Sequence, residues 1–100
     1  MSAPLTVGLL RVVLHLPDSG SLKSKRMIVS GLLRRLRDHL KVSAAEVGEL
    51  DRWQLAELAV ATVSGDSRHA DEVLATVLRY IESHSDGARI TDVSTELVRL

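Results

Sequence analysis

Three cationic side chains, Lys23, Lys25 and Arg26, lie close together in the segment SLKSKR, residues 21–26. Apolar residues recur with a helical period over residues 22–40, so the segment is predicted to open a helix. A helix carries partial positive charge at its N-terminal end, and each cation placed there costs about 0.3–1 kcal/mol. The same end offers free backbone N–H groups to phosphates and other anions. These residues therefore predict an anion-binding site at the start of the helix.

The positive charge continues along the predicted helix. At about 100° per residue, five of its cations share an arc of about 80° that flanks the apolar face: Lys23, Arg26, Arg34, Arg37 and Lys41. Lys25 falls within the apolar arc, where its stem can lie against apolar neighbours. Asp38 is the one carboxylate between Ser19 and Ala45, whereas ordinary exposed helices mix signs. All six cations, Lys25 included, are candidate phosphate or RNA ligands; the alternative is a solvated helix face without a ligand.

Composition limits the classes of protein that the chain can belong to. The chain has 100 residues, 45% of them hydrophobic and 26% charged, which predicts one soluble domain over residues 1–100. It contains no Cys and no Phe, so the core must be aliphatic, and disulfides and thiolate metal sites are excluded. The apolar run of residues 9–16 is too short for a membrane span. We therefore expect a cytoplasmic protein that does not enter the membrane.

The zero net charge of the chain hides an asymmetry. Residues 1–45 hold eight Lys and Arg against two Asp and Glu, and residues 46–100 hold five against eleven. The protein is therefore expected to be dipolar, with most of its positive charge on one helix.

The pattern of apolar residues predicts six elements. They are a strand over residues 5–16, a helix over 22–40, strands over 42–48 and 55–63, a helix over about 68–84 and a strand over 89–98. Two β-α-β halves in this order predict an α+β, ferredoxin-like βαββαβ fold, with a four-stranded antiparallel sheet and both helices on one face. The first and third strands are the most apolar and should lie in the centre of the sheet. The second and fourth carry the polar residues typical of edge strands.

The first strand should present apolar side chains on the sheet face that no helix covers. Its alternation places Val7, Leu9 and Val13 on that face. Exposed apolar patches usually mark an interface, so we expect a homodimer formed through the open sheet face. The alternative is that these are scattered surface aliphatics, which are common.

Trp53 lies in the turn between the second and third strands. A lone Trp in such a turn most often folds back over the end of a small core, and this is the favoured interpretation. The alternatives are that Trp53 stacks on a base or covers a partner surface, so it joins the candidate interface residues.

Several kinds of site are disfavoured by the sequence. The central strands have no Phe, Tyr or Trp, which argues against RNA binding in the manner of an RRM. The loop over residues 17–20 matches no phosphate-binding loop of a nucleotide hydrolase. The four His residues are far apart and lack metal-ligand spacing. With no catalytic motif, we expect no cofactor, no metal and no enzymatic activity, although a small phosphorylated ligand at the helix start remains an alternative.

A family resemblance follows from four segments: LHLP over residues 14–17, SLKSKR over 21–26, VSAAEV over 42–47 and DRWQ over 51–54. In this combination the chain resembles the YlxP-like family, small bacterial proteins known as a domain of unknown function. The resemblance covers essentially the whole chain and implies a ferredoxin-like fold. It also implies a role near RNA or the ribosome, because members are often encoded beside ribosome maturation and translation initiation genes. Many members carry an acidic residue where this chain has Ser24, so this helix start is more positive.

These observations lead to two hypotheses. The first is a non-enzymatic factor that binds RNA or a ribosomal subunit through the phosphates. The second is a homodimeric interaction module that uses the open sheet face and binds no nucleic acid.

Overall fold

The computed structural model describes residues 3–100. Its elements are β1 (Thr6–His15), α1 (Leu22–Leu40), β2 (Ser43–Gly48), β3 (Leu55–Ser64), α2 (Ser67–His84) and β4 (Arg89–Arg99). The predicted βαββαβ order is confirmed, and the predicted ends differ from the observed ones by one residue or coincide with them.

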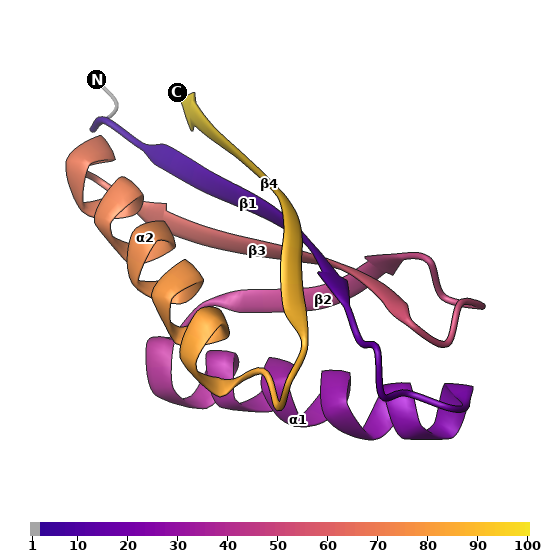
Figure 1. Cartoon of the computed structure of the whole chain (residues 1–100). Helices are drawn as coiled ribbons and strands as arrows, with labels where there is room; N and C mark the ends of the chain where they lie inside the picture. Colours follow the sequence, from indigo (N-terminus) through magenta and orange to yellow (C-terminus); the bar gives the residue numbers. More distant parts are fainter. Residues whose placement is uncertain (1–2) are drawn as a thin grey trace.

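The four strands form one antiparallel sheet in the order β2-β3-β1-β4. The strands predicted to be central, β1 and β3, pair along ten residues each, from Thr6 opposite Ser64 to His15 opposite Leu55. Both helices lie on the same side of this sheet, α1 at the lower edge of the view in Figure 1 and α2 at the left. The fold is therefore ferredoxin-like, as the sequence predicted.

The core lies between the sheet and the helices and is aliphatic. Alternate residues of β1, among them Leu10, Val12 and Leu14, are at most 2% exposed and face the helices. From α1 the core receives Leu32 and Leu36, both fully buried. Burying each such side chain contributes about 1.5–3 kcal/mol, so this face fixes how α1 lies on the sheet and which of its residues point away from it.

Local signals set the ends of the helices. Ser21 is the N-cap of α1, and its hydroxyl oxygen accepts a hydrogen bond from the backbone N–H of Ser24 at 3.0 Å. Asp66 caps α2 in the same way through the N–H of Arg68. Lys41 ends α1 in the left-handed conformation, with φ of 56°, which is typical of a helix C-terminus.

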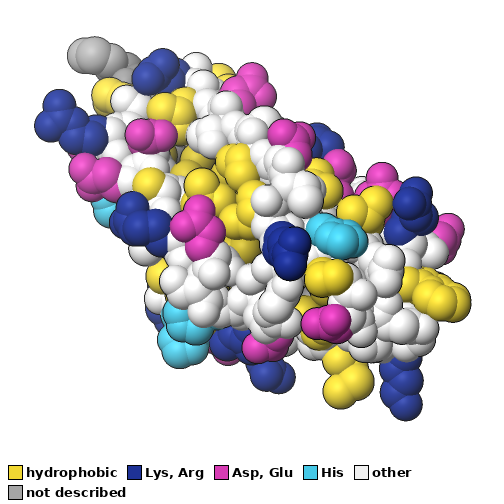
Figure 2. All heavy atoms as spheres, viewed as in Figure 1, with side chains coloured by type: hydrophobic (Ala, Val, Ile, Leu, Met, Phe, Trp, Pro, Cys, Tyr) yellow, Lys and Arg dark blue, Asp and Glu magenta, His cyan; other side chains and the backbone are white. Residues whose placement is uncertain are grey.

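The edge strand β4 leaves part of the core visible. Figure 2 shows apolar side chains between α2 and β4, and Val93 of β4 is 38% exposed. The opposite edge strand, β2, lies beside α1. The two edges of the sheet therefore differ in charge, because α1 and its Lys and Arg side chains lie beside β2.

Candidate anion-binding surface

Four of the six predicted phosphate ligands lie on the outer face of α1, and a fifth, Lys41, follows as its C-cap. Their side chains are all exposed, and we call them the basic stripe: Lys23, Arg26, Arg34, Arg37 and Lys41. Lys and Arg side chains project from the lower side of the molecule in Figure 2, where Figure 1 places α1. From Lys23 to Lys41 the stripe extends about 27 Å at about 1.5 Å per residue.

The basic stripe has no carboxylate partner within residues 3–100. The ion pairs of this part of the chain are Arg11–Glu57, Lys25–Glu46 and Arg52–Glu49. None of them includes a residue of the basic stripe. Because no internal pair neutralises these five cations, their charge is available to an anion from outside.

Arg37 has a second contact, with the backbone of the edge strand. Its Nε and one terminal nitrogen donate hydrogen bonds to the carbonyl oxygen of Ala44, at 3.1 and 2.6 Å. A strand with one neighbour leaves part of its backbone without a ladder partner, and Arg37 supplies one to β2. The guanidinium keeps its charge and further N–H donors, so Arg37 can both cover the edge and meet a phosphate.

A shallow groove runs between the first half of α1 and β2. It has a volume of about 450 Å³ and its walls include Lys23, Arg26, Ser30 and Glu46. Arg35, which does not belong to the basic stripe, points to the other side of α1 and donates a hydrogen bond to the carbonyl of His84 at the end of α2. The basic stripe therefore follows the β2 edge of the molecule and not the contact between the helices.

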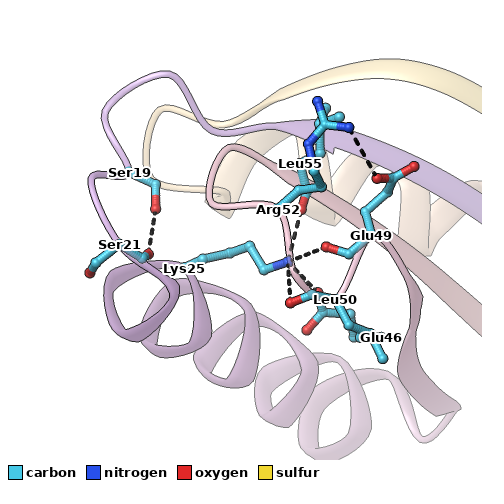
Figure 3. Close-up of polar contacts among 8 residues, drawn as sticks. All are labelled: Ser19, Ser21, Lys25, Glu46, Glu49, Leu50, Arg52 and Leu55. Atoms are coloured by element: carbon cyan, nitrogen blue, oxygen red, sulfur yellow. Dashed lines mark hydrogen bonds and ion pairs between the residues drawn. The ribbon is translucent and has the colours of Figure 1, made fainter.

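Lys25 differs from its prediction as a phosphate ligand. Its side chain is 1% exposed and its ammonium nitrogen lies 2.9 Å from a carboxylate oxygen of Glu46 (Figure 3). The ammonium also donates hydrogen bonds to the carbonyls of Glu49 at 2.7 Å and Leu55 at 2.9 Å. A third, longer hydrogen bond reaches the carbonyl of Leu50 at 3.5 Å. The three ammonium protons thus have backbone acceptors, and Lys25 is not available to an external phosphate.

The contacts of Lys25 also explain why a cation is tolerated at the start of a helix. The macrodipole disfavours it there, but a carboxylate and two backbone carbonyls within hydrogen-bonding distance offset that cost. Lys25 therefore connects α1 to the turn between β2 and β3, which we call the β2–β3 turn, residues 49–54.

The partners of the Lys25 ammonium were not predicted from the sequence. Glu46 belongs to a short strand of small residues, and the carbonyls of Glu49, Leu50 and Leu55 carry no side-chain signal at all. The one signal in the sequence is that Lys25 lies in the apolar arc of α1. A cation in such a position needs buried partners.

The four predicted interface residues lie in two places. Val7 and Val13 are half-buried and Leu9 is 38% exposed, all on the face of β1 that no helix covers. The partner of Val7 across the sheet, Val63, is 67% exposed. Trp53 is separate from this face, because it lies in the β2–β3 turn.

Trp53 also differs from its favoured interpretation. Its side chain is 55% exposed and does not belong to the buried core cluster of the described residues. It therefore does not fold back as a cover over the end of the core, and the two surface alternatives remain.

Within residues 3–100, no three His, Cys, Asp or Glu side chains come together as a metal-binding group. No helix of these residues is both long and apolar enough to cross a membrane.

Residues 7–95 match the family model described as "Protein of unknown function (DUF503)". The chain belongs to this DUF503 family. One similar protein is the "Uncharacterized protein YlxP" of Bacillus subtilis (strain 168), which is 36% identical over 66 residues, 66% of this chain and 72% of that protein. The predicted YlxP-like resemblance is thereby confirmed, and the DUF503 family brings no assigned activity with it.

Two designed proteins share the fold of this DUF503 member. The de novo designed protein Foldit4 has a TM-score of 0.54 and 15% sequence identity, over 94% of this chain and 96% of its own. The de novo designed protein LFR1 1, described as having a ferredoxin fold, has a TM-score of 0.51 and 11% identity, over 94% and 83%. These similarities support the ferredoxin-like fold and say nothing about activity.

Proposed function

We propose that this protein is a cytoplasmic, non-enzymatic factor that binds RNA, free or in a ribosomal subunit, through phosphate contacts of the basic stripe. The observation that carries the proposal is the set of five exposed cations along α1 and at its C-cap without a carboxylate partner in residues 3–100. Contacts of Lys and Arg with phosphates supply most of the sequence-independent affinity for nucleic acids. A backbone-tracking surface of this kind fits a nucleic acid strand.

The sheet supports this mode over the common alternative for this topology. RRM domains stack bases on aromatic side chains of their central strands, and β1 and β3 carry no Phe, Tyr or Trp. The helix, and not the sheet, therefore offers the contacts with RNA.

The salt dependence of binding tests the proposal. Single-stranded binding should weaken with a slope of log K against log salt of about −0.7 per phosphate contact, hence about −3.5 for five contacts. Fluorescence anisotropy of a labelled single-stranded RNA measures this slope. An affinity that is undetectable at low salt would contradict the proposal.

A matched pair of variants separates the basic stripe from net charge. Arg34→Gln removes one cation from the stripe, and Arg79→Gln removes one from the exposed side of α2. We expect Arg34→Gln to reduce the slope by about 0.7, with no change for Arg79→Gln. Equal effects of the two variants would show that the stripe is not the binding surface.

The second candidate function is homodimerisation through the open sheet face. The observation in its favour is that exposed aliphatic side chains lie there, Val63 at 67% and Leu9 at 38% exposure. Leu9 also borders a hollow of about 440 Å³, whose lining includes the polar residues Arg11, Ser94 and Glu96. Three strands of ten or eleven residues and one of six give a face of at most roughly 33 Å by 19 Å. Two such faces approach the area of a small specific interface. Light scattering of the protein at several concentrations tests this candidate.

A further inference from the structure

Trp53 is held in place by the backbone on both sides of it. The ammonium of Lys25 binds the carbonyls of Glu49 and Leu55, which precede and follow Trp53 in the chain (Figure 3). The neighbouring Gln54 donates a side-chain hydrogen bond to the carbonyl of Pro17 at 3.1 Å, and its own carbonyl accepts one from the N–H of Leu16 at 2.8 Å. A large side chain that is 55% exposed therefore stands on a fixed turn.

The turn lies at the same end of the molecule as the first residues of the basic stripe. Lys25 provides the connection, because it precedes Arg26 on α1 and reaches the β2–β3 turn with its ammonium. The groove of α1 is lined by Lys23, Arg26 and Glu46, and Glu46 is also the carboxylate partner of Lys25. In Figure 1 the start of α1 and the β2–β3 turn both lie at the right.

Two of the three charged residues of the turn pair with each other within the protein. Glu49 lies 3.9 Å from Arg52, which leaves Asp51 as the remaining carboxylate of the turn, and Glu46 of the adjacent strand β2 pairs with Lys25. Trp53 therefore contributes an exposed, flat apolar surface to the turn and no additional charge.

We infer that Trp53 stacks on an unpaired base of the RNA whose phosphates contact Lys23 and Arg26, so that the ligand is single-stranded at this end of the stripe. Binding of single strands commonly combines a positive surface that follows the backbone with aromatic side chains on which bases stack. The bases of a continuous duplex are stacked on one another and present no free face. This inference rests on the proposed RNA binding and adds the kind of RNA that the site selects.

Intrinsic fluorescence tests the inference directly, because Trp53 is the single Trp of the chain. A single-stranded oligoribonucleotide should quench the fluorescence of Trp53, excited where Tyr80 does not absorb. Inorganic polyphosphate, which can contact the stripe by charge alone, and a blunt duplex of the same sequence should bind without quenching. Anisotropy of the labelled oligonucleotide reports binding in parallel.

The matched variant is Trp53→Leu, which keeps an apolar side chain and removes the stacking surface. Because Trp53 is exposed, we expect the circular dichroism spectrum of the variant to stay native. Its affinity for the single strand should fall about tenfold, as expected for the loss of one stacked base, and its affinity for polyphosphate should stay unchanged.

The possible failures can be distinguished. Anisotropy that shows binding, with unchanged fluorescence and native affinity of Trp53→Leu, would overturn the inference and leave the proposed phosphate contacts intact. Quenching by polyphosphate or by the duplex equal to that by the single strand would also overturn it. Absence of binding in the anisotropy measurement at low salt would remove the proposed function and this inference together.

Discussion

At the scale of single residues, Lys25 shows how a charge that resembles a ligand contact can belong to the fold. Lys23 and Arg26, its neighbours in the same helical turn, are exposed, whereas the ammonium of Lys25 is enclosed by Glu46 and by carbonyls of the β2–β3 turn. Removing one partner of a buried pair leaves the other charge without compensation. The contribution of Lys25 should therefore appear in the stability of the fold and not as a phosphate contact with RNA.

We expect Lys25→Met to lower the free energy of unfolding by about 3 kcal/mol, the usual cost of breaking a buried ion pair. Urea denaturation measures the change. The matched control is Lys23→Met on the exposed side of the same helical turn, which should change stability by less than about 0.5 kcal/mol. Similar losses for the two variants would contradict the structural role of Lys25.

The sequence contained part of this information. The helical period places Lys25 on the apolar side of α1, and this position alone separates it from the five cations of the basic stripe. Its partners could not be predicted in the same way, because backbone carbonyls 24 to 30 residues further along the chain have no sequence pattern. Likewise, the sequence shows a single Trp in a turn, but the exposure of Trp53 depends on the hydrogen bonds that hold this turn, and these could not be predicted.

At the scale of elements, α1 serves two surfaces at once. One face packs Leu32 and Leu36 against the sheet, and the opposite side carries the basic stripe. Ser30 lies between Arg26 and Arg34, one helical turn from each, is exposed and lines the groove. It is therefore the position at which a further cation would extend the stripe without disturbing the core.

We expect Ser30→Lys to strengthen binding to single-stranded RNA and to steepen the salt slope by about 0.7. Like charges one turn apart should lower helix stability by about 0.2–0.5 kcal/mol per pair. Ala75→Lys adds the same charge at an exposed site of α2 and should leave the slope unchanged. A stronger effect of Ala75→Lys would place the binding surface elsewhere.

The elements themselves were predictable, because apolar periods, turn residues and N-caps are local. The close approach of α2 to β1 was not. A Cβ atom added at Gly8 would lie 3.1 Å from Cδ1 of Leu74 and 3.2 Å from Cγ2 of Thr62. In the sequence, nothing explains why Gly8 interrupts an apolar strand. In the structure, the side chains of Leu74 and Thr62 occupy the space that a larger residue would need.

We expect Gly8→Val to destabilise the protein by about 1–3 kcal/mol, since the added methyl groups must displace Leu74 from the core. Thermal unfolding measures this loss. Gly20→Val is the control, because a Cβ added at Gly20 has no neighbour within 4 Å. If both variants unfold at the same temperature, the packing of α2 on β1 is less close than described.

At the scale of the whole molecule, the two candidate surfaces lie on different sides. The basic stripe belongs to α1, and the open sheet face lies opposite the helix layer (Figure 1). Two copies joined through their sheets would leave both basic stripes exposed. Dimerisation and RNA binding are therefore compatible, and a dimer would carry two binding surfaces.

This arrangement predicts an effect of chain length in the RNA. Leu9→Asp places a charge in the centre of the open sheet face and should convert the proposed dimer into a monomer, as light scattering would show. For a short RNA the affinity per chain should stay unchanged, because α1 is untouched. For an RNA long enough to reach both stripes the affinity should fall, because the gain from linked binding, often 10²-fold or more, is lost.

The control for this prediction is Met27→Asp, which adds the same charge at a residue that is 69% exposed on α1 and distant from the open sheet face. It should leave the mass of the dimer unchanged and weaken binding of short and long RNA alike, because it places a carboxylate beside Lys23 and Arg26 in the groove. The two variants thus distinguish the two surfaces. Leu9→Asp changes the number of basic stripes in one particle, and Met27→Asp changes the affinity of each stripe for RNA. A native protein that is monomeric at every concentration would exclude the dimer, while the predictions for the basic stripe would still stand, since each chain carries a complete one.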